Sequence, residues 1–231
     1  MTTPTLAISE IFGPTVQGEG PTAGRRAAFV RLGRCNLDCV WCDTPYTWDW
    51  DRYDPAVEVT PTPVAEVVAR LDAMAVARVV VTGGEPLLQQ RGLVPLLGAL
   101  GERGWAVEVE TNGTIAPTPA VAAAVTAFNV SPKLANSGIA PSRRIRPAAL
   151  GALVETGKAA FKFVVAEPSE LDEVASLVAA HGLAPVWIMP EGTSAAVVSG
   201  RLAALADEVV ARGWNLTTRL HVVLWGDERG R

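Results

Sequence analysis

The sequence has few cysteines, few histidines, no excess of positive charge and no long apolar run, and each shortage excludes a class of protein. Its 20 Lys and Arg are outnumbered by 24 Asp and Glu, so the net charge is −4 and no basic field can hold nucleic acid. No run of about 18 apolar residues occurs, so we expect no membrane span. The region 1–14 has no basic segment followed by an apolar stretch, so we expect no secretory signal.

The composition that is present is that of a globular domain. Apolar residues make up 49% and charged residues 19% of the chain, whereas a disordered protein has fewer apolar residues and more charge. A chain of 231 residues can bury most of its apolar surface on folding. We therefore expect one domain that spans residues 1–231.

Short apolar, β-branched runs alternate along the chain with segments of helical periodicity. Continuous runs such as Val79-Val80-Val81 predict strands that are buried on both faces, as in parallel sheets. This alternation predicts an α/β fold with mostly parallel strands, in which ligands gather at the carboxyl ends of the strands. The predicted strands span 28–32, 77–81, 106–110, 128–130, 159–165, 186–189 and 220–224.

Helices are predicted from start signals and from apolar spacing. Thr62 followed by Pro63 predicts a helix that runs to about residue 74. Leucines at 93, 96, 97 and 100 predict a second helix that ends at Gly104. Ser169 is the predicted cap of a third helix that runs toward residue 181. Apolar residues at 202, 205, 209 and 210 predict a fourth that ends near Gly213.

The segment 44–63 has no clear period and is rich in Pro, Asp, Trp and Tyr. It predicts a long loop. Two interpretations remain open for it, a loop that covers a functional site and a surface excursion without a role.

The cysteines are Cys35, Cys39 and Cys42, an odd number within eight residues. They form no disulfide framework and indicate a reducing compartment, which we expect to be the cytoplasm, and a metal or cluster. A zinc ion needs four ligands, and only His181 and His221 could complete such a site. An iron–sulfur cluster held by three thiolates would keep one iron open for a ligand. On the residues alone, zinc, a cluster and three structural cysteines all remain open.

The spacing Cys-x3-Cys-x2-Cys, with Trp41 before the last cysteine, resembles the signature of radical S-adenosylmethionine (SAM) enzymes. The resemblance implies that the three thiolates hold a [4Fe–4S] cluster whose open iron binds the amino and carboxylate groups of SAM. It also implies that one electron from the cluster cleaves SAM to methionine and a 5′-deoxyadenosyl radical.

A second motif, Gly-Gly-Glu-Pro at 83–86, directly follows the predicted strand 77–81 and Thr82. Glycines let a backbone approach a ligand closely, and a carboxylate accepts hydrogen bonds from an ammonium group. One strand–helix unit after the cysteines, the motif resembles the glycine-rich strand end that holds the methionyl amino group of SAM in these enzymes.

Four further segments are Gln-Gly-Glu-Gly at 17–20, Cys-Asp-Thr at 42–44, Glu-Thr-Asn-Gly at 110–113 and Ser-Pro-Lys at 131–133. In this order they resemble the 7-carboxy-7-deazaguanine synthase family, over essentially the whole chain from residue 8. The resemblance implies a partial, reduced radical SAM barrel. It implies conversion of 6-carboxy-5,6,7,8-tetrahydropterin to 7-carboxy-7-deazaguanine and ammonia, on the route to deazapurines such as queuosine. It further implies that SAM is regenerated, that Mg²⁺ is required, that an external donor supplies electrons and that the enzyme is a homodimer.

The resemblance also assigns roles to single residues. Cys35, Cys39 and Cys42 match the cluster ligands, and Thr44 matches a hydroxyl ligand of Mg²⁺. Arg31 matches the arginine that pairs with the substrate carboxylate, which a guanidinium can bind through two parallel hydrogen bonds. The implied SAM contacts are Trp41, Cys42, Asp43, Gly84, Glu85, Ser131, Pro132, Lys133, Met189, Pro190, Glu191 and Gly192. The implied substrate contacts are Val16, Gln17, Gly18, Glu19, Arg31, Thr82 and His221.

Several of these residues keep a second interpretation. Arg31 could face solvent, and Gln17 and Glu19 could form an ordinary polar turn. Lys162 could line the interior of the barrel or be exposed. Glu110 is expected to line the site, with a structural role at a strand end as the alternative.

The C-terminal region departs from the family. Residues 219–222 are Arg-Leu-His-Val, where many relatives have Gln-Thr-His-Lys, so the role of His221 and that of the terminal carboxylate remain open. Two rival functions also remain, a glycyl-radical activase with the same cysteine spacing and a zinc or redox-sensing module.

Overall fold

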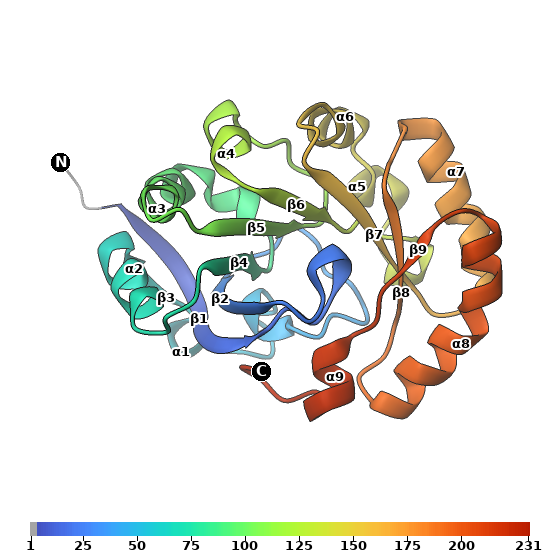
Figure 1. The fold of residues 1–231 in the computed structure, drawn as a ribbon, viewed down its shortest axis with the longest axis horizontal. Helices are drawn as coiled ribbons and strands as arrows, with labels where there is room; N and C mark the ends of the chain where they lie inside the picture. The colour runs from blue at the N-terminus through green and yellow to red at the C-terminus, as the bar shows by residue number, and fades with distance from the viewer. Residues whose placement is uncertain (1–3) are drawn as a thin grey trace.

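The computed structural model describes residues 4–231, so the first three residues of the predicted domain lie outside the described residues. A curved sheet has the strand order β3-β1-β2-β4-β5-β6-β7-β8-β9 (Figure 1). Within this part of the chain β3 and β9 do not pair with each other, so the barrel is open, and the α/β, partial-barrel prediction is confirmed. The strands are β1 Thr5–Val16, β2 Arg26–Leu32, β3 Thr60–Pro63, β4 Arg78–Gly83, β5 Ala106–Thr111, β6 Ala127–Val130, β7 Ala159–Val165, β8 Val186–Pro190 and β9 Asn215–Leu216.

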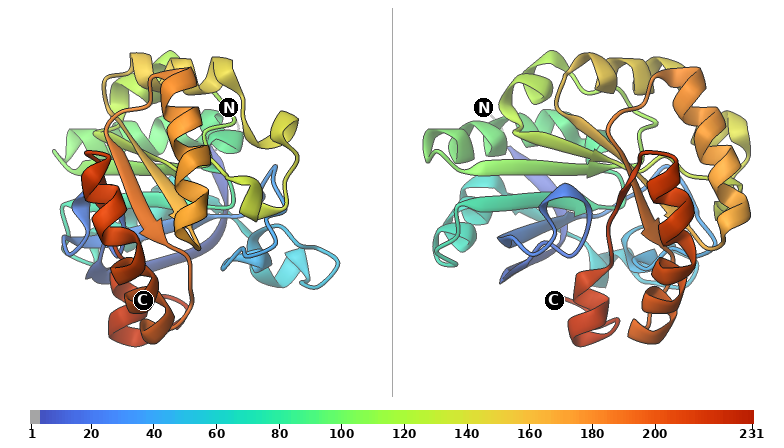
Figure 2. Two further views of the ribbon diagram at one scale, coloured as in Figure 1. Left: turned by 90° about the vertical axis from the view of Figure 1, so that its right-hand side faces the viewer. Right: turned by 45° about the vertical axis from the view of Figure 1, so that its right-hand side comes forward.

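Helices cover the outer side of the curved sheet, as the two views of Figure 2 show. Most connect one parallel strand to the next, which is the strand–helix alternation predicted from the sequence. The helices are α1 Pro55–Glu58, α2 Val64–Asp72, α3 Gln90–Glu102, α4 Pro119–Ala124, α5 Pro141–Arg144, α6 Pro147–Glu155, α7 Leu171–His181, α8 Ala195–Ala211 and α9 Leu220–Trp225. The shorter 3₁₀ turns are η1 Gly20–Thr22, η2 Pro45–Thr47, η3 Pro86–Gln89, η4 Ala135–Ser137 and η5 Pro168–Glu170.

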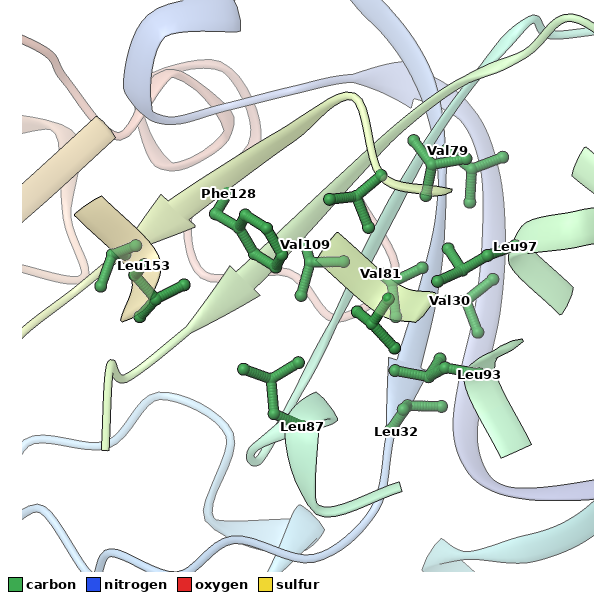
Figure 3. Packing of buried hydrophobic residues seen from close by; sticks show 14 of the residues in the cluster. Val30, Leu32, Val79, Val81, Leu87, Leu93, Leu97, Val109, Phe128 and Leu153 are labelled. Carbon is green, nitrogen blue, oxygen red and sulfur yellow. The ribbon is translucent and has the colours of Figure 1, made fainter. Parts of the chain in front are cut away.

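The core lies between the sheet and these helices. Val79 and Val81 of β4 belong to the same buried cluster as Leu93 and Leu97 of α3 (Figure 3). Val80, which lies between Val79 and Val81, is equally buried but belongs to a second cluster with Ala27 and Phe29 of β2. The run of three valines is therefore buried on both faces, as its sequence predicted.

The longest strand, β1, was not predicted. It pairs antiparallel with β2 and β3, whereas the parallel order starts at β2. Its register with β2 shifts between Phe12 and Thr15, where Gly13-Pro14 interrupts the pleat, and this break hides the period-2 pattern. Gly13 has φ +140°, and a Cβ there would lie 2.9 Å from Cα of Ala28, so the close approach of the strands needs glycine.

The predicted strand 220–224 is wrong, because this segment forms helix α9. The chain leaves the sheet after the two residues of β9, and the Leu220 N–H donates to the Gly18 carbonyl at 2.8 Å. Only Val222 is buried in α9, since the helix packs beside α8 and the loop at Gly18 rather than in the sheet. A tertiary contact, which no local period encodes, decides this segment.

Two predicted helix starts also differ from the structure. Thr62 lies in β3, and α2 begins at Val64 without a side-chain cap. Ser169 lies in η5, where its hydroxyl donates to the Glu167 carboxylate, and α7 begins at Leu171. The predicted ends at Gly104 and Gly213 are confirmed, with φ of +69° and +71°. The apolar face of α8 is narrower than predicted, because Val210 is 68% exposed.

The segment 44–63 is not one long loop. It contains η2, α1 and β3, and its first half, through Thr44, Tyr46 and Trp48, lines the cavity described below. No described helix has the length and apolar character needed to cross a membrane.

Candidate active site

A cavity of about 310 Å³ opens at the carboxyl ends of the parallel strands. Its walls come from the segments that follow β2, β4, β5, β6 and β8, together with residues 16–19 and α9. It collects the predicted site residues from all parts of the chain. All of them line the cavity except Glu85, Pro132 and Pro190.

The cysteine loop, residues 33–44, has no helix or strand and carries three free, partly exposed thiols into the cavity. Burial raises the pKa of Cys35 to about 12 and raises that of Cys39, so without a bound metal these thiols hold their protons. Metal binding at these sulfurs therefore has to displace protons.

The spread of the three sulfurs bears on which group fits. Within residues 4–231, no three His, Cys, Asp or Glu side chains converge closely enough to hold a single metal ion. A [4Fe–4S] cluster is larger than an ion, and its thiolates bind separate irons, so three cysteines around one cavity fit it. The zinc interpretation lacks a compact set of ligands.

Gly83 and Gly84 hold the cysteine loop against the end of β4. A Cβ on Gly83 would lie 2.1 Å from the Leu32 carbonyl oxygen, and one on Gly84 would lie 2.1 Å from that of Arg34. The close approach expected of these glycines is thus made to the backbone that leads into Cys35. Gly84 also lines the cavity, as predicted.

The prediction that Glu85 binds SAM needs correction. Its side chain is fully buried, lies outside the cavity lining, and accepts hydrogen bonds from the N–H groups of Leu87 and Asn112 and the hydroxyl of Thr111. Burial raises the pKa of this carboxyl. Glu85 therefore ties the end of β4 to the end of β5 and has no oxygen directed at a ligand.

Lys133 and Trp41 lie against each other in the cavity lining. The Lys133 ammonium lies 5.2 Å from the centre of the Trp41 ring and donates to Oγ of Ser131 at 3.0 Å. The Trp41 indole donates to Oδ1 of Asn136 at 3.2 Å. These contacts join the cysteine loop to the segment after β6, which is where SAM contacts were predicted.

A hydrogen-bonded chain of polar side chains lines the inner wall. The Gln17 amide donates to Oε1 of Glu110 at 3.0 Å, and the Thr82 hydroxyl donates to Oε2 of the same carboxylate at 2.7 Å. Glu110 therefore lines the site, as expected, and it fixes two predicted substrate contacts.

Glu19 is the centre of an ionic network on the same wall. It pairs with the Lys162 ammonium and, at 3.1 Å, with Nε of Arg219. Burial opposes the charged form of Glu19, but the two cations outweigh it and hold the pKa well below its usual range. Nε2 of His221 lies 4.0 Å from the carboxylate, and burial lowers the pKa of this imidazole. Lys162 thus lines the interior, which answers the question that its sequence left open.

Arg219 links this network to the cysteine loop and to the segment after β8. It donates to the Gly192 carbonyl at 2.6 Å and pairs with the Asp43 carboxylate. Three predicted site segments, 16–19, 42–44 and 189–192, therefore meet at one buried guanidinium.

Glu10 orients Arg31 through a hydrogen bond at Nε of the guanidinium. Nε of Arg31 donates to Oε2 of Glu10 at 2.8 Å, and the Tyr46 hydroxyl donates to the same oxygen at 3.0 Å. In the described part of the chain Nη1 and Nη2 of Arg31 donate no hydrogen bond, and the residue lines the cavity. This edge of the guanidinium can therefore receive a carboxylate.

The tail that follows α9 also reaches the cavity. Arg229 pairs with the carboxylates of Glu10 and Glu58 and lies 3.8 Å from the centre of the Tyr46 ring. Residues 227–231 line the mouth of the cavity.

Comparison with known proteins agrees with this geometry. The sequence model of the radical SAM superfamily matches residues 30–162. The chain is 41% identical to the 7-carboxy-7-deazaguanine synthase of Pyrobaculum aerophilum, over 99% of each chain. It is 37% identical to the synthase of that name from Halobacterium salinarum, over 97% of this chain and 92% of the relative.

The chain belongs to the 7-carboxy-7-deazaguanine synthase family of the radical SAM superfamily. The crystal structure of QueE from Escherichia coli superimposes with a TM-score of 0.72 at 26% identity, over 94% of this chain and 95% of that one. The structure of Streptococcus suis SuiB is 15% identical with a TM-score of 0.57 and shares the fold. Membership in this family implies SAM and a [4Fe–4S] cluster. It argues against both rival functions, the glycyl-radical activase and the zinc or redox-sensing module.

Several residues of this synthase-family cavity were missed by sequence reasoning. Asn129 gave a usable signal, since a polar residue at the centre of the apolar run 128–130 has to face the interior. Trp48 and Arg219 gave none, because their contacts cross an irregular turn or join segments that are distant in sequence. Glu10 lies outside the cavity lining and orients Arg31, and it gave no signal either.

Proposed function

We propose that this enzyme converts 6-carboxy-5,6,7,8-tetrahydropterin to 7-carboxy-7-deazaguanine with release of ammonia, and uses SAM catalytically. The observation that carries the proposal is that one cavity joins three free thiols to a wall of ordered polar side chains. When bound, the cluster and SAM supply the radical chemistry. The chain's own residues bind, orient and shield the substrate.

Each wall of the cavity has a part in this proposal. Cys35, Cys39 and Cys42 hold the cluster, and the segments around Asp43, Gly84 and Lys133 hold SAM. The remaining SAM contacts are Trp41, Ser131, Met189, Glu191 and Gly192, with Pro132 and Pro190 as neighbours outside the cavity lining.

The substrate binds between Arg31 and the polar inner wall. The free edge of Arg31 binds the substrate carboxylate. The amino and amide N–H groups of a pterin need acceptors, and Gln17, held by Glu110, lies at that wall with Val16, Gly18, Glu19 and Thr82. His221 is neutral near pH 7, because burial lowers its pKa, so it can donate or accept one hydrogen bond.

We assign Mg²⁺ to the Thr44 hydroxyl, with substrate oxygens completing its shell. Oγ1 of Thr44 lies 3.8 Å from Sγ of Cys42, so this ion would lie beside the cluster. Thr44→Ala should weaken the stimulation of activity by added Mg²⁺, and Thr44→Ser should retain it. A Mg²⁺ titration of the initial rate checks this, and an unaltered response in Thr44→Ala would remove the assignment.

The wider setting follows from the same proposal. We propose a single domain, a homodimer and an external electron donor. Three free thiols that are to bind a cluster require a reducing compartment, for which we propose the cytoplasm.

The decisive experiment is anaerobic reconstitution with iron and sulfide, followed by assay with SAM, a reductant, Mg²⁺ and 6-carboxytetrahydropterin. We expect 7-carboxy-7-deazaguanine and ammonia in equal amounts, with SAM not consumed. Protein with a full cluster that forms no deazapurine would overturn the substrate. Protein that takes up no cluster would overturn the reaction class.

A further inference from the structure

Trp48 lies in the segment 44–63, and its indole points at a cysteine of the proposed cluster site. Nε1 of Trp48 lies 3.3 Å from Sγ of Cys42. An indole N–H donates hydrogen bonds and accepts none, so the sulfur has to be the acceptor. The contact therefore runs in one direction, from a side chain toward a thiolate ligand.

The turn η2 holds the indole in this place. The N–H and the hydroxyl of Thr47 both donate to the Thr44 carbonyl, at 3.0 and 2.8 Å. Thr47 is fully buried, and its own carbonyl accepts from the Arg34 N–H at 2.6 Å. The chain thus turns back on itself and is tied to the cysteine loop, so the indole is positioned before any ligand binds.

The three thiols differ in their hydrogen-bond donors. Sγ of Cys35 accepts from the backbone N–H of Leu37 at 3.5 Å. Sγ of Cys42 lies 3.8 Å from Oγ1 of Thr44, and among residues 4–231 Trp48 carries the one side-chain N–H that donates to any of the three sulfurs. The Cys42 contact can therefore be removed by substitution without a change in the loop backbone.

We propose that Trp48 raises the reduction potential of the [4Fe–4S] cluster by donating a hydrogen bond to the Cys42 thiolate. This inference rests on the proposed function, in which Cys42 is a cluster ligand. An external low-potential reductant adds one electron, no proton moves and no bond breaks. The N–H dipole stabilises the added negative charge, so the reduced form gains more from the bond than the oxidised form does. Trp48 is a positioning residue, since it acts on the cluster through Cys42.

Trp48→Phe tests this, because phenylalanine keeps an aromatic ring and lacks the N–H. The readout is the midpoint potential of the reconstituted holoenzyme, from a redox titration with dithionite followed by electron paramagnetic resonance. At a given potential, the ratio of reduced to oxidised cluster should fall several-fold, up to about tenfold, which for a one-electron couple is about 59 mV.

Trp50→Phe is the matched control. Trp50 is 39% exposed, and within the described chain its indole donates no hydrogen bond, so its replacement should leave the potential at the wild-type value. An equal potential in Trp48→Phe and wild type, both with full clusters, would overturn the proposal and leave the proposed function intact. A wild-type protein that takes up no cluster would overturn both.

A second measurement tests the hydrogen bond even if the Trp48→Phe variant fails to fold or to bind iron. Wild-type holoenzyme labelled with ¹⁵N in the indole rings should show a ¹⁵N coupling to the reduced cluster in pulsed electron paramagnetic resonance. The same coupling should appear in labelled Trp50→Phe. Its absence from the reduced wild-type cluster would contradict the hydrogen bond.

Discussion

The cysteine loop and the polar inner wall of the cavity are built in opposite ways. The cysteine loop, residues 33–44, presents three thiols that form no ion pair and no disulfide within the described chain. The inner wall, centred on Glu19, Lys162 and Arg219, is already joined by internal ion pairs. The thiols of the cysteine loop need a bound cluster as their partner, whereas the inner wall is held in place by its own ion pairs. One wall should therefore tolerate substitution without loss of fold, and the other should not.

Cys39→Ala should give the largest change, in activity alone. Without the third ligand the cluster should be lost, and deazapurine formation should fall by at least about 1000-fold, because the cofactor supplies the radical chemistry. Thermal unfolding of the metal-free protein should hardly change, since Cys39 is partly exposed and holds no internal pair. Iron content, product formation and the melting temperature are the measurements.

The neighbour Val40, which is 77% exposed, supplies the control, and Val40→Ala should keep both the cluster and the activity. A Cys39→Ala protein that retains iron and turnover would show that the loop does not ligate through this residue.

Lys162→Met should give the second largest change, in stability. It removes one of the two buried cations that pair with Glu19, whose side chain is 15% exposed, and breaking a buried pair on one side costs about 3 kcal/mol. Unfolding in denaturant measures the loss. Adding Glu19→Gln to this variant should recover part of it, since the uncompensated charge is then removed. A fully stable Lys162→Met would mean that Arg219 alone satisfies the carboxylate.

Arg31→Ala should act on substrate binding and leave the cluster intact. A hydrogen bond to a charged group contributes about 1.5–3 kcal/mol, so the KM for 6-carboxytetrahydropterin should rise by about 10- to 100-fold. Steady-state kinetics with matched iron content checks this. Arg31→Lys keeps the charge but not the two parallel hydrogen bonds, so its KM should lie between those of Arg31→Ala and the wild type. An unchanged KM in Arg31→Ala would leave the residue as a partner of Glu10 and no more.

His221 should give the smallest change, in the pH dependence of stability. Burial lowers its pKa in the folded state below the ordinary 6.5, so the unfolded chain binds the proton first. Stability is then constant above about pH 6.5 and falls as the pH drops through 6.5 toward the folded pKa. His221→Gln should reduce the loss of stability between pH 7 and pH 5, measured by denaturant unfolding at each pH.

The sequence predicted the parallel strands from their apolar runs, and the family resemblance assigned most of the residues that line the cavity. Motifs such as 83–86 and 131–133 follow buried strands, and the carboxyl ends of parallel strands meet at one edge, so motifs far apart along the chain converge. Each motif therefore needed only its own strand to be placed correctly.

What could not be predicted depends on contacts between distant segments. The apolar run 220–224 is compatible with a strand and with a helix, and its contact with Gly18 decides in favour of the helix. Glu85 has a motif position typical of a ligand contact, yet its oxygens are used by β5. Arg219 stands where many relatives have glutamine, so the resemblance assigned it no role, and its three partners lie 27 to 200 residues away in the chain.

The two edges of the open sheet limit how copies of this chain can associate. One edge is β3, Thr60–Pro63, in which Pro61 and Pro63 lack the N–H groups that a further strand would need. The other is β9, which is two residues long. Within residues 4–231 neither of these two terminal strands is a good template for strand addition, which protects them from edge-to-edge aggregation. We therefore expect the proposed homodimer to join through other surfaces, and its interface to survive substitutions along β3 and β9.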